Sequence, residues 1–229
     1  MKFNFEEGEV ILIDKPYKWT SFDVVKKIRN SVRIKKVGHA GTLDPLATGL
    51  LVVCTGKMTK IIDTIQDQEK EYTGEIILGA TSPSFDLETE VTPFVGISNK
   101  EITIDILLNA TKEFIGVIQQ VPPIYSAIRV GGVRLYKKAR RGETVDIPPR
   151  EVTVKEFFIE AFNYPSVKFK VICSKGTYIR SLAHDLGQAL GTGAYLSELC
   201  RTRIGNLKLE NSNKLPDFIE QVKLYQNNL

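Results

Sequence analysis

The first part of the chain alternates between short apolar runs and one stretch with helical spacing. Residues 10–13 are all apolar and end at a turn that contains Pro16, which predicts a short buried strand. After the turn, Thr20 stands three residues before Asp23, as in a capping box. We therefore expect a helix that begins near Thr20, with an apolar face formed by Phe22, Val25, Ile28 and Val32.

Two later segments have the pattern of strands. Residues 50–54 form a continuous apolar run, which is typical of a buried element. Residues 70–78 alternate, and the strand period places one set of side chains on a common side: Tyr72, Gly74, Ile76 and Leu78. Residues 80–93 then predict a loop.

The second half of the chain predicts a further amphipathic helix and several strands. Residues 101–114 have helical spacing, and their core side should carry Ile104, Leu107, Leu108 and Ile115. A strand at 124–130 should enter a hairpin turn at Gly131 and Gly132. Further elements follow in chain order: antiparallel strands at 151–162 and 166–174, a helix at 181–190, a strand at 195–204 and a helix at 216–229.

The composition of the 229 residues is that of an ordinary soluble protein, with 42% hydrophobic and 25% charged residues. No apolar run has membrane-spanning length, and the beginning MKFNFEEGEV is too polar for a secretory signal, so we expect a cytoplasmic protein. Cys54, Cys173 and Cys200 lack CxxC spacing and predict reduced thiols. With only two histidines besides, the sequence predicts no metal site.

Positive charge is concentrated in two segments, although the net charge is only +4. The first basic cluster contains no acid and consists of Lys26, Lys27, Arg29, Arg33, Lys35 and Lys36. The second basic cluster, which we expect to be uncompensated, consists of Arg129, Arg134, Lys137, Lys138, Arg140 and Arg141. A basic run is often only a solvated face, but two clusters that flank one glycine-rich loop favour a nucleic acid partner.

That loop, residues 36–53 with the sequence KVGHAGTLDPLATGLLVV, carries the candidate chemistry. Gly38 and Gly41 allow the backbone to approach another molecule closely. Asp44 precedes Pro45 and is therefore biased toward an extended conformation that projects its carboxylate. The alternative is that Asp44 caps the N-terminus of a helix with Pro45 in its first turn.

The string GHAGTLDPLATGLL resembles the signature loop of the TruB family of tRNA pseudouridine synthases. Other blocks of that family are matched in the same order over about residues 10–210: DKPYKWTSFDVV, KEYTGEIILG, VPPIYSAIRVGGVRLYKKARRGE, SKGTYIRSLAHDLG and LCRTRIG. The resemblance implies an α+β pseudouridine synthase fold, with a central mixed, mostly antiparallel sheet flanked by helices and a catalytic cleft. It also implies a catalytic domain over 1–215, a thumb-like hairpin insertion at about 119–150, and a C-terminal helix at 216–229 without a PUA domain.

The resemblance implies isomerisation of the T-loop uridine-55 of tRNA to pseudouridine, by an aspartate and without a cofactor. The target base must leave the stack to react. The implied partner is the T-arm stem-loop of tRNA. Apart from the resemblance, we expect a monomer with no protein partner and no membrane association. The absence of a P-loop and of a dinucleotide fingerprint is compatible with such chemistry.

Within the family pattern, Asp44 is the catalytic residue, which attacks the ribose carbon or the base, or assists departure of the base. Arg180 would pair with Asp44 and keep its carboxylate ionised. Tyr72 would stack on the uracil and take the C5 proton, with Tyr178 as the alternative acceptor or a pocket wall. If the strand at 166–174 stays extended beyond its end, Tyr178 and Arg180 fall on the same face.

The resemblance also implies a set of substrate-binding residues: His39, which would fill the gap left by the flipped base, Leu199, Lys15, Gly41, Thr42 and Arg141. Ordinary interpretations stand beside these roles. Without the family, Tyr72 is a strand aromatic, Arg180 forms a surface salt bridge and His39 is a hydrogen-bonded loop residue.

The chain departs from the family pattern at a few positions. It has Lys18 where glycine is usual, and Ser82 and Glu88 where the family tends to have aspartate and glycine, which leaves an RNA contact at Asp86 open. Two other functions are weighed: a tRNA-binding or folding factor, for which the basic clusters suffice, and a hydrolase with an aspartate nucleophile. The hydrolase needs a second acid/base carboxylate, and no motif supplies one.

Overall fold

The computed structural model describes residues 3–95 and 101–228, which form two compact units. Unit 1 comprises Met1–Thr73 and Leu199–Leu229, and unit 2 comprises Gly74–Glu198. Two strands, β4 (Lys70–Leu78) and β12 (Ala194–Ile204), contribute residues to both units.

The sheet of unit 1 is organised around β3 (Thr48–Thr55), which is buried along nearly its whole length. It pairs antiparallel with β1 (Val10–Lys15) and β2 (Val37–His39), and parallel with the end of β12. The edges of this sheet are completed by two short strands: β13 (Leu207–Lys208), which pairs with β12, and β14 (Asn213–Lys214), which pairs with β1.

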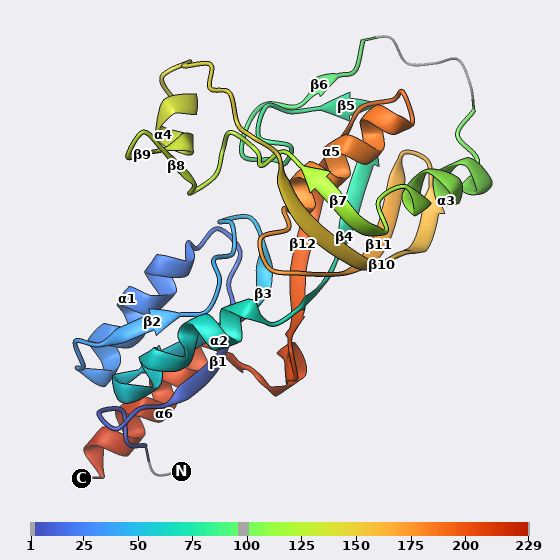
Figure 1. Cartoon of the computed structure of the whole chain (residues 1–229). Coiled ribbons are helices and arrows are strands. Elements are labelled where there is room, and N and C mark those ends of the chain that lie inside the picture. Colours follow the sequence, from blue (N-terminus) through green and yellow to red (C-terminus); the bar gives the residue numbers. More distant parts are fainter. Residues whose placement is uncertain (1–2, 96–100, 229) are drawn as a thin grey trace. The chain divides into compact units, whose positions relative to one another are not determined.

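The alternating side chains of β1 and β3 supply two hydrophobic cores in unit 1. On one face, α1 (Ser21–Val32) and α6 (Leu215–Asn227) cover a cluster that includes Ile13 and Leu51 (Figure 1). Leu50 and Val52 point to the other core, which contacts the segment formed by η1 (Gly56–Ile61) and α2 (Ile62–Asp67). The continuous apolar run of β3 is therefore explained by burial on both faces.

In unit 2 the strands lie in the order β12, β4, β11, β10 and β7. Strands β10 (Arg150–Asn163) and β11 (Ser166–Cys173) form a long antiparallel hairpin, and β7 (Gly116–Gln120) pairs antiparallel with β10. The remaining elements are α3 (Ile104–Lys112), α5 (Ile179–Ala189), the pair β5 (Ala80–Thr81) and β6 (Thr92–Pro93), the hairpin β8 (Arg129–Val130) and β9 (Val133–Arg134), and α4 (Leu135–Ala139).

The expected fold class, a mixed α/β protein with a mixed and mostly antiparallel sheet flanked by helices, is confirmed. Some local predictions are wrong. Phe22 is 60% exposed, and Val24 is buried instead; the other three residues of the expected face of α1 are buried as predicted. Of the apolar residues expected on the next helix, only Leu107 is buried, while Ile104, Leu108 and Ile115 are each at least 40% exposed. Ile115 also lies beyond the end of α3. The strand expected at 124–130 is reduced to β8.

Candidate active site

The loop between β2 and β3 presents Asp44 from a turn. The carbonyl oxygen of Asp44 accepts a hydrogen bond from the Ala47 N–H at 3.1 Å, so that Pro45 occupies the second position of the turn. The chain then enters β3 at Thr48. Asp44 therefore does not cap a helix, and its side chain is partly exposed.

Two buried cations hold the backbone of this loop. Arg201, which is 1% exposed, donates from Nε to the Leu50 carbonyl at 2.9 Å and from an Nη atom to the Gly41 carbonyl at 3.0 Å. Lys15 is fully buried, and its Nζ donates to the Pro45 carbonyl at 3.2 Å. Charged donors form strong hydrogen bonds in a dry environment, so both ends of the loop are fixed.

A third contact holds the residue that precedes Asp44. Ser21, the first residue of α1, lies directly after the N-cap residue Thr20, whose capping box with Asp23 fixes the start of the helix. The Ser21 hydroxyl donates to the Leu43 carbonyl at 3.1 Å and accepts from the Leu43 N–H at 2.8 Å. The start of α1 thus sets the position of the loop.

The cations also set the charge state of their surroundings. Burial lowers the pKa of Lys15 to about 8, and the Asp44 carboxylate opposes this shift. Burial and the nearby Arg201 charge lower the pKa of His39, against a hydrogen bond with the Gly41 backbone that raises it. His39 is therefore neutral at pH 7, and it is the last residue of β2 rather than a loop residue.

The other predicted residues of unit 1 lie on or next to β3 and β4. Tyr72 is 8% exposed and follows Glu71, which accepts a hydrogen bond from the Thr202 hydroxyl at 2.8 Å. The Leu199 carbonyl accepts from the Thr48 hydroxyl at 3.4 Å. In the loop itself, Thr42 is exposed and Gly41 has a φ of +89°, which favours glycine.

In unit 2, Arg180 lies in the first turn of α5 and is 2% exposed. Its guanidinium contacts the Asp86 carboxylate at 3.6 Å and donates to the carbonyls of Ser84 at 3.0 Å and Tyr125 at 2.9 Å. The exposed surface salt bridge of the ordinary interpretation is therefore wrong. Asp86 is 5% exposed and is used to hold Arg180.

The extended conformation does not continue through Arg180, which corrects our expectation for this segment. The chain turns at Gly176, where φ is +82°, and Tyr178 becomes the N-cap residue of α5. The Gln120 side chain accepts from the Tyr178 N–H at 2.8 Å and donates to the Tyr178 carbonyl at 3.1 Å. These two bonds fix Tyr178 in an extended conformation, and the helix begins at the next residue.

The second basic cluster is partly compensated, contrary to expectation. Arg140 lies 3.2 Å from the Glu88 carboxylate, and Arg141 lies 3.6 Å from the Glu143 carboxylate. Glu143 also lies 3.9 Å from Lys138. Glu143 lies at the end of the same segment, and Glu88 lies in the loop that contains Asp86. The prediction missed them because it considered only the cations of the segment.

Three buried side chains with a positioning role were not predicted: Ser21, Gln120 and Arg201. Each binds backbone atoms of a predicted residue or its neighbour, and such contacts leave little signal in a single sequence. Over residues 3–95 and 101–228, no group of three or more His, Cys, Asp or Glu side chains is arranged for a metal ion. In the same ranges no helix combines the length and apolar character needed to cross a membrane.

Comparisons with known proteins cover nearly the whole chain. The family model "TruB family pseudouridylate synthase (N terminal domain)" matches residues 29–179, and the model "tRNA pseudouridylate synthase B C-terminal domain" matches residues 180–228. A protein of Flavobacterium johnsoniae named tRNA pseudouridine synthase B is 49% identical over 95% of this chain and 97% of its own length. A protein of Phocaeicola vulgatus with the same name is 47% identical over 96% and 97%.

Solved structures are similar over the same range. A chain of the "Crystal Structure of a Cbf5-Nop10-Gar1 Complex" is 31% identical, with a TM-score of 0.76. The match covers 98% of the present chain and 57% of that chain, so the present chain spans little more than half of its length.

Proposed function

The chain belongs to the TruB family of pseudouridylate synthases, and we propose that it converts the T-loop uridine-55 of tRNA to pseudouridine. The enzyme is an isomerase. The reaction breaks the bond between N1 of the uracil and the ribose, and joins the ribose to C5 of the rotated base. N1 gains a proton and C5 loses one, so the atoms balance without a cofactor.

The observation that best supports this proposal is the loop that carries Asp44. Lys15, Ser21 and Arg201 are all buried, and all bind backbone atoms of the segment between Gly41 and Leu50. A reaction that depends on one carboxylate requires that its backbone does not move when the RNA binds. Asp44 supplies the catalytic carboxylate of the proposal. Lys15, which the sequence assigns to the substrate, acts here by holding the loop.

The other roles implied by the family belong to the same proposal. Tyr72 stacks on the uracil and takes the C5 proton, and His39 fills the gap left by the flipped base. Roles for Arg180, Tyr178, Leu199, Thr42 and Arg141 stay predictions. The enzyme acts as a cytoplasmic monomer on the T arm, and residues 119–150 close over the RNA as a thumb.

The test uses an unmodified T-arm hairpin with tritium at C5 of the target uridine. The wild-type protein should release the label into water without changing the length of the RNA. Asp44→Asn should abolish release while hairpin affinity stays within about threefold, because the side chains are nearly isosteric. Asp63→Asn, on the exposed side of α2, is the matched control and should release label at the wild-type rate. Near-normal release by Asp44→Asn would exclude the catalytic role.

A further inference from the structure

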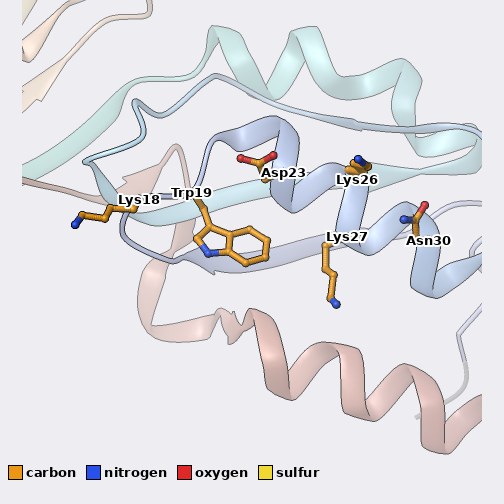
Figure 2. Close-up of a pocket in the computed structure, with 6 residues that line it drawn as sticks. All are labelled: Lys18, Trp19, Asp23, Lys26, Lys27 and Asn30. Atoms are coloured by element: carbon orange, nitrogen blue, oxygen red, sulfur yellow. The ribbon is translucent and has the colours of Figure 1, made fainter. Parts of the chain in front are cut away.

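A hollow of about 320 Å³ lies beside the N-terminal half of α1 (Figure 2). Its walls come from the turn before the helix and from one side of the helix: Lys18, Trp19, Asp23, Lys26, Lys27 and Asn30. The family pattern quoted above assigns no role to this hollow.

The spacing of the helical residues explains why they share one side. Positions 23, 26, 27 and 30 follow the i, i+3, i+4, i+7 spacing of a helix face, opposite the face that Val24 and Ile28 bury in the core. Trp19 packs its indole partly against that core, so the aromatic wall is fixed. Lys18 is held next to it by a backbone with a φ of 65°.

The charge of the hollow is positive. Lys18, Lys26 and Lys27 are exposed, and within the described ranges none of the three forms an ion pair with a carboxylate. The single acid of the hollow, Asp23, is committed to the helix N-terminus, where it accepts from the Thr20 N–H at 3.0 Å. One carboxylate, that of Asp23, therefore faces three ammonium groups, and its hydrogen bonds with Thr20 and the charge of Lys26 lower its pKa without a close ion pair to Lys26.

The Lys15 amine hydrogen-bonds both to a residue that lines the hollow and to a residue of the Asp44 loop. Lys15 Nζ donates to the Trp19 carbonyl at 2.6 Å and to the Pro45 carbonyl at 3.2 Å. The backbone of Trp19 and the backbone of the turn that presents Asp44 therefore bind the same buried amine.

We propose that this hollow binds the sugar-phosphate backbone of the tRNA substrate outside the target nucleotide, with one ribose or base against the Trp19 indole. Ammonium groups neutralise phosphates, and an indole provides a face on which a nucleotide packs. We favour RNA over an acidic peptide because every nucleotide carries both a phosphate and a flat ring. The inference rests on the proposed function, because it takes tRNA as the substrate.

Trp19 is the only tryptophan of the chain, so its fluorescence reports on the hollow directly. An unmodified tRNA transcript is titrated into the wild-type protein while the quenching of Trp19 by acrylamide is followed. Bound tRNA should protect Trp19, with the same midpoint as binding measured by filter retention. Saturation with tRNA without any protection of Trp19 would overturn the proposal.

A pair of charge variants tests the lysines. Lys26→Gln with Lys27→Gln should raise the Kd for tRNA about 5- to 10-fold and lower the slope of log K against log salt by about 1 to 2, since each phosphate contact contributes about 0.7–0.9. Lys60→Gln with Lys223→Gln removes the same charge from exposed positions outside the hollow and should change the Kd less than about twofold. If both double variants changed the Kd for tRNA equally, the lysines of the hollow would contribute only as general surface charge. That result would overturn the proposal.

Tritium release separates this inference from the proposed function. If wild-type protein releases label and the two lysine pairs bind tRNA alike, the hollow is excluded and the function stands. If wild-type protein releases no label, the proposed function fails, whatever the tryptophan signal shows.

Discussion

Ser21 and Leu43 exchange two hydrogen bonds, at 3.1 Å and 2.8 Å, between one side chain and one residue's backbone. Both residues are at most 3% exposed. Because Asp44 follows Leu43 directly, this pair ties the loop that carries Asp44 to the first residue of α1. The position of the Asp44 carboxylate therefore depends on the hydroxyl group of a residue on another element.

Removing that hydroxyl should affect both stability and rate. Ser21→Ala leaves the buried N–H and C=O of Leu43 unpaired, which should lower the free energy of unfolding by about 2–3 kcal/mol. Single-turnover isomerisation should slow roughly tenfold or more, with the Kd for tRNA nearly unchanged, because the reacting group is displaced. Ser31→Ala, which removes a hydroxyl bonded to the Lys27 carbonyl on the same helix, is the control and should cost less than about 0.5 kcal/mol. A wild-type rate in Ser21→Ala would remove the positioning role.

Tyr72→Phe separates stacking from proton transfer. The substitution keeps the ring, which is 8% exposed, and removes the hydroxyl. We expect a single-turnover rate lower by about 100-fold or more, the usual loss when a general base is removed, with hairpin affinity retained. Tyr225→Phe, which removes a hydroxyl bonded to the Phe3 carbonyl, should leave the rate unchanged. An unaffected rate in Tyr72→Phe would assign proton transfer elsewhere.

Lys18→Gly should stabilise the protein. Lys18 has a φ of 65°, where a side chain costs about 1–2 kcal/mol. Glycine loses more entropy on folding, which offsets about 0.5–1 kcal/mol, so the net gain in unfolding free energy should be about 0.5 kcal/mol. Urea unfolding measures it. Lys27→Gly, in the helical part of α1, should instead lower stability by about 1 kcal/mol.

Asp185→Asn tests a partly buried acid in α5. Burial raises the pKa of Asp185 to about 6. Between the ordinary value of 3.8 and 6, the folded state holds a proton that the unfolded state has lost, so this group lowers stability as pH rises through that window. The variant should exceed the wild type in unfolding free energy by about 1–3 kcal/mol at pH 7.5, and the difference should vanish near pH 4. A constant difference across that range would contradict the assignment.

Prediction from the sequence was most accurate where the hydrophobic pattern arises from one buried face. The alternation over β4 gave the bounds of that strand and its buried side, because one face of the strand packs on the core and the other does not. The pattern was weaker in α3, where hydrophobic spacing indicated a broad buried face but the nine-residue helix buries only Leu107 of the expected set. Hydrophobic residues remain exposed there because folding need not bury every apolar side chain.

The candidate site residues were predicted from motifs, but the residues that hold their backbone in place were not. Asp44 and Arg180 could be named because they stand in the blocks GHAGTLDPLATGLL and SKGTYIRSLAHDLG that resemble the family. Arg201 and Gln120 act on carbonyl and amide groups of other segments, and every residue has such groups, so no spacing identifies the partner. The start of α5 was missed for the same reason, because the Gln120 amide fixes Tyr178 from a segment 58 residues away.

Because Lys15 is completely buried, the accessibility of its amine reports on the opening of the loop that carries Asp44. An amine-reactive label cannot reach Nζ while the carbonyls of Pro16, Trp19 and Pro45 surround it. Its pKa of about 8 leaves an appreciable fraction uncharged near neutral pH, in the form that reacts with acylating reagents. The rate of Lys15 acylation therefore measures how often this loop opens transiently. Bound tRNA should lower that rate.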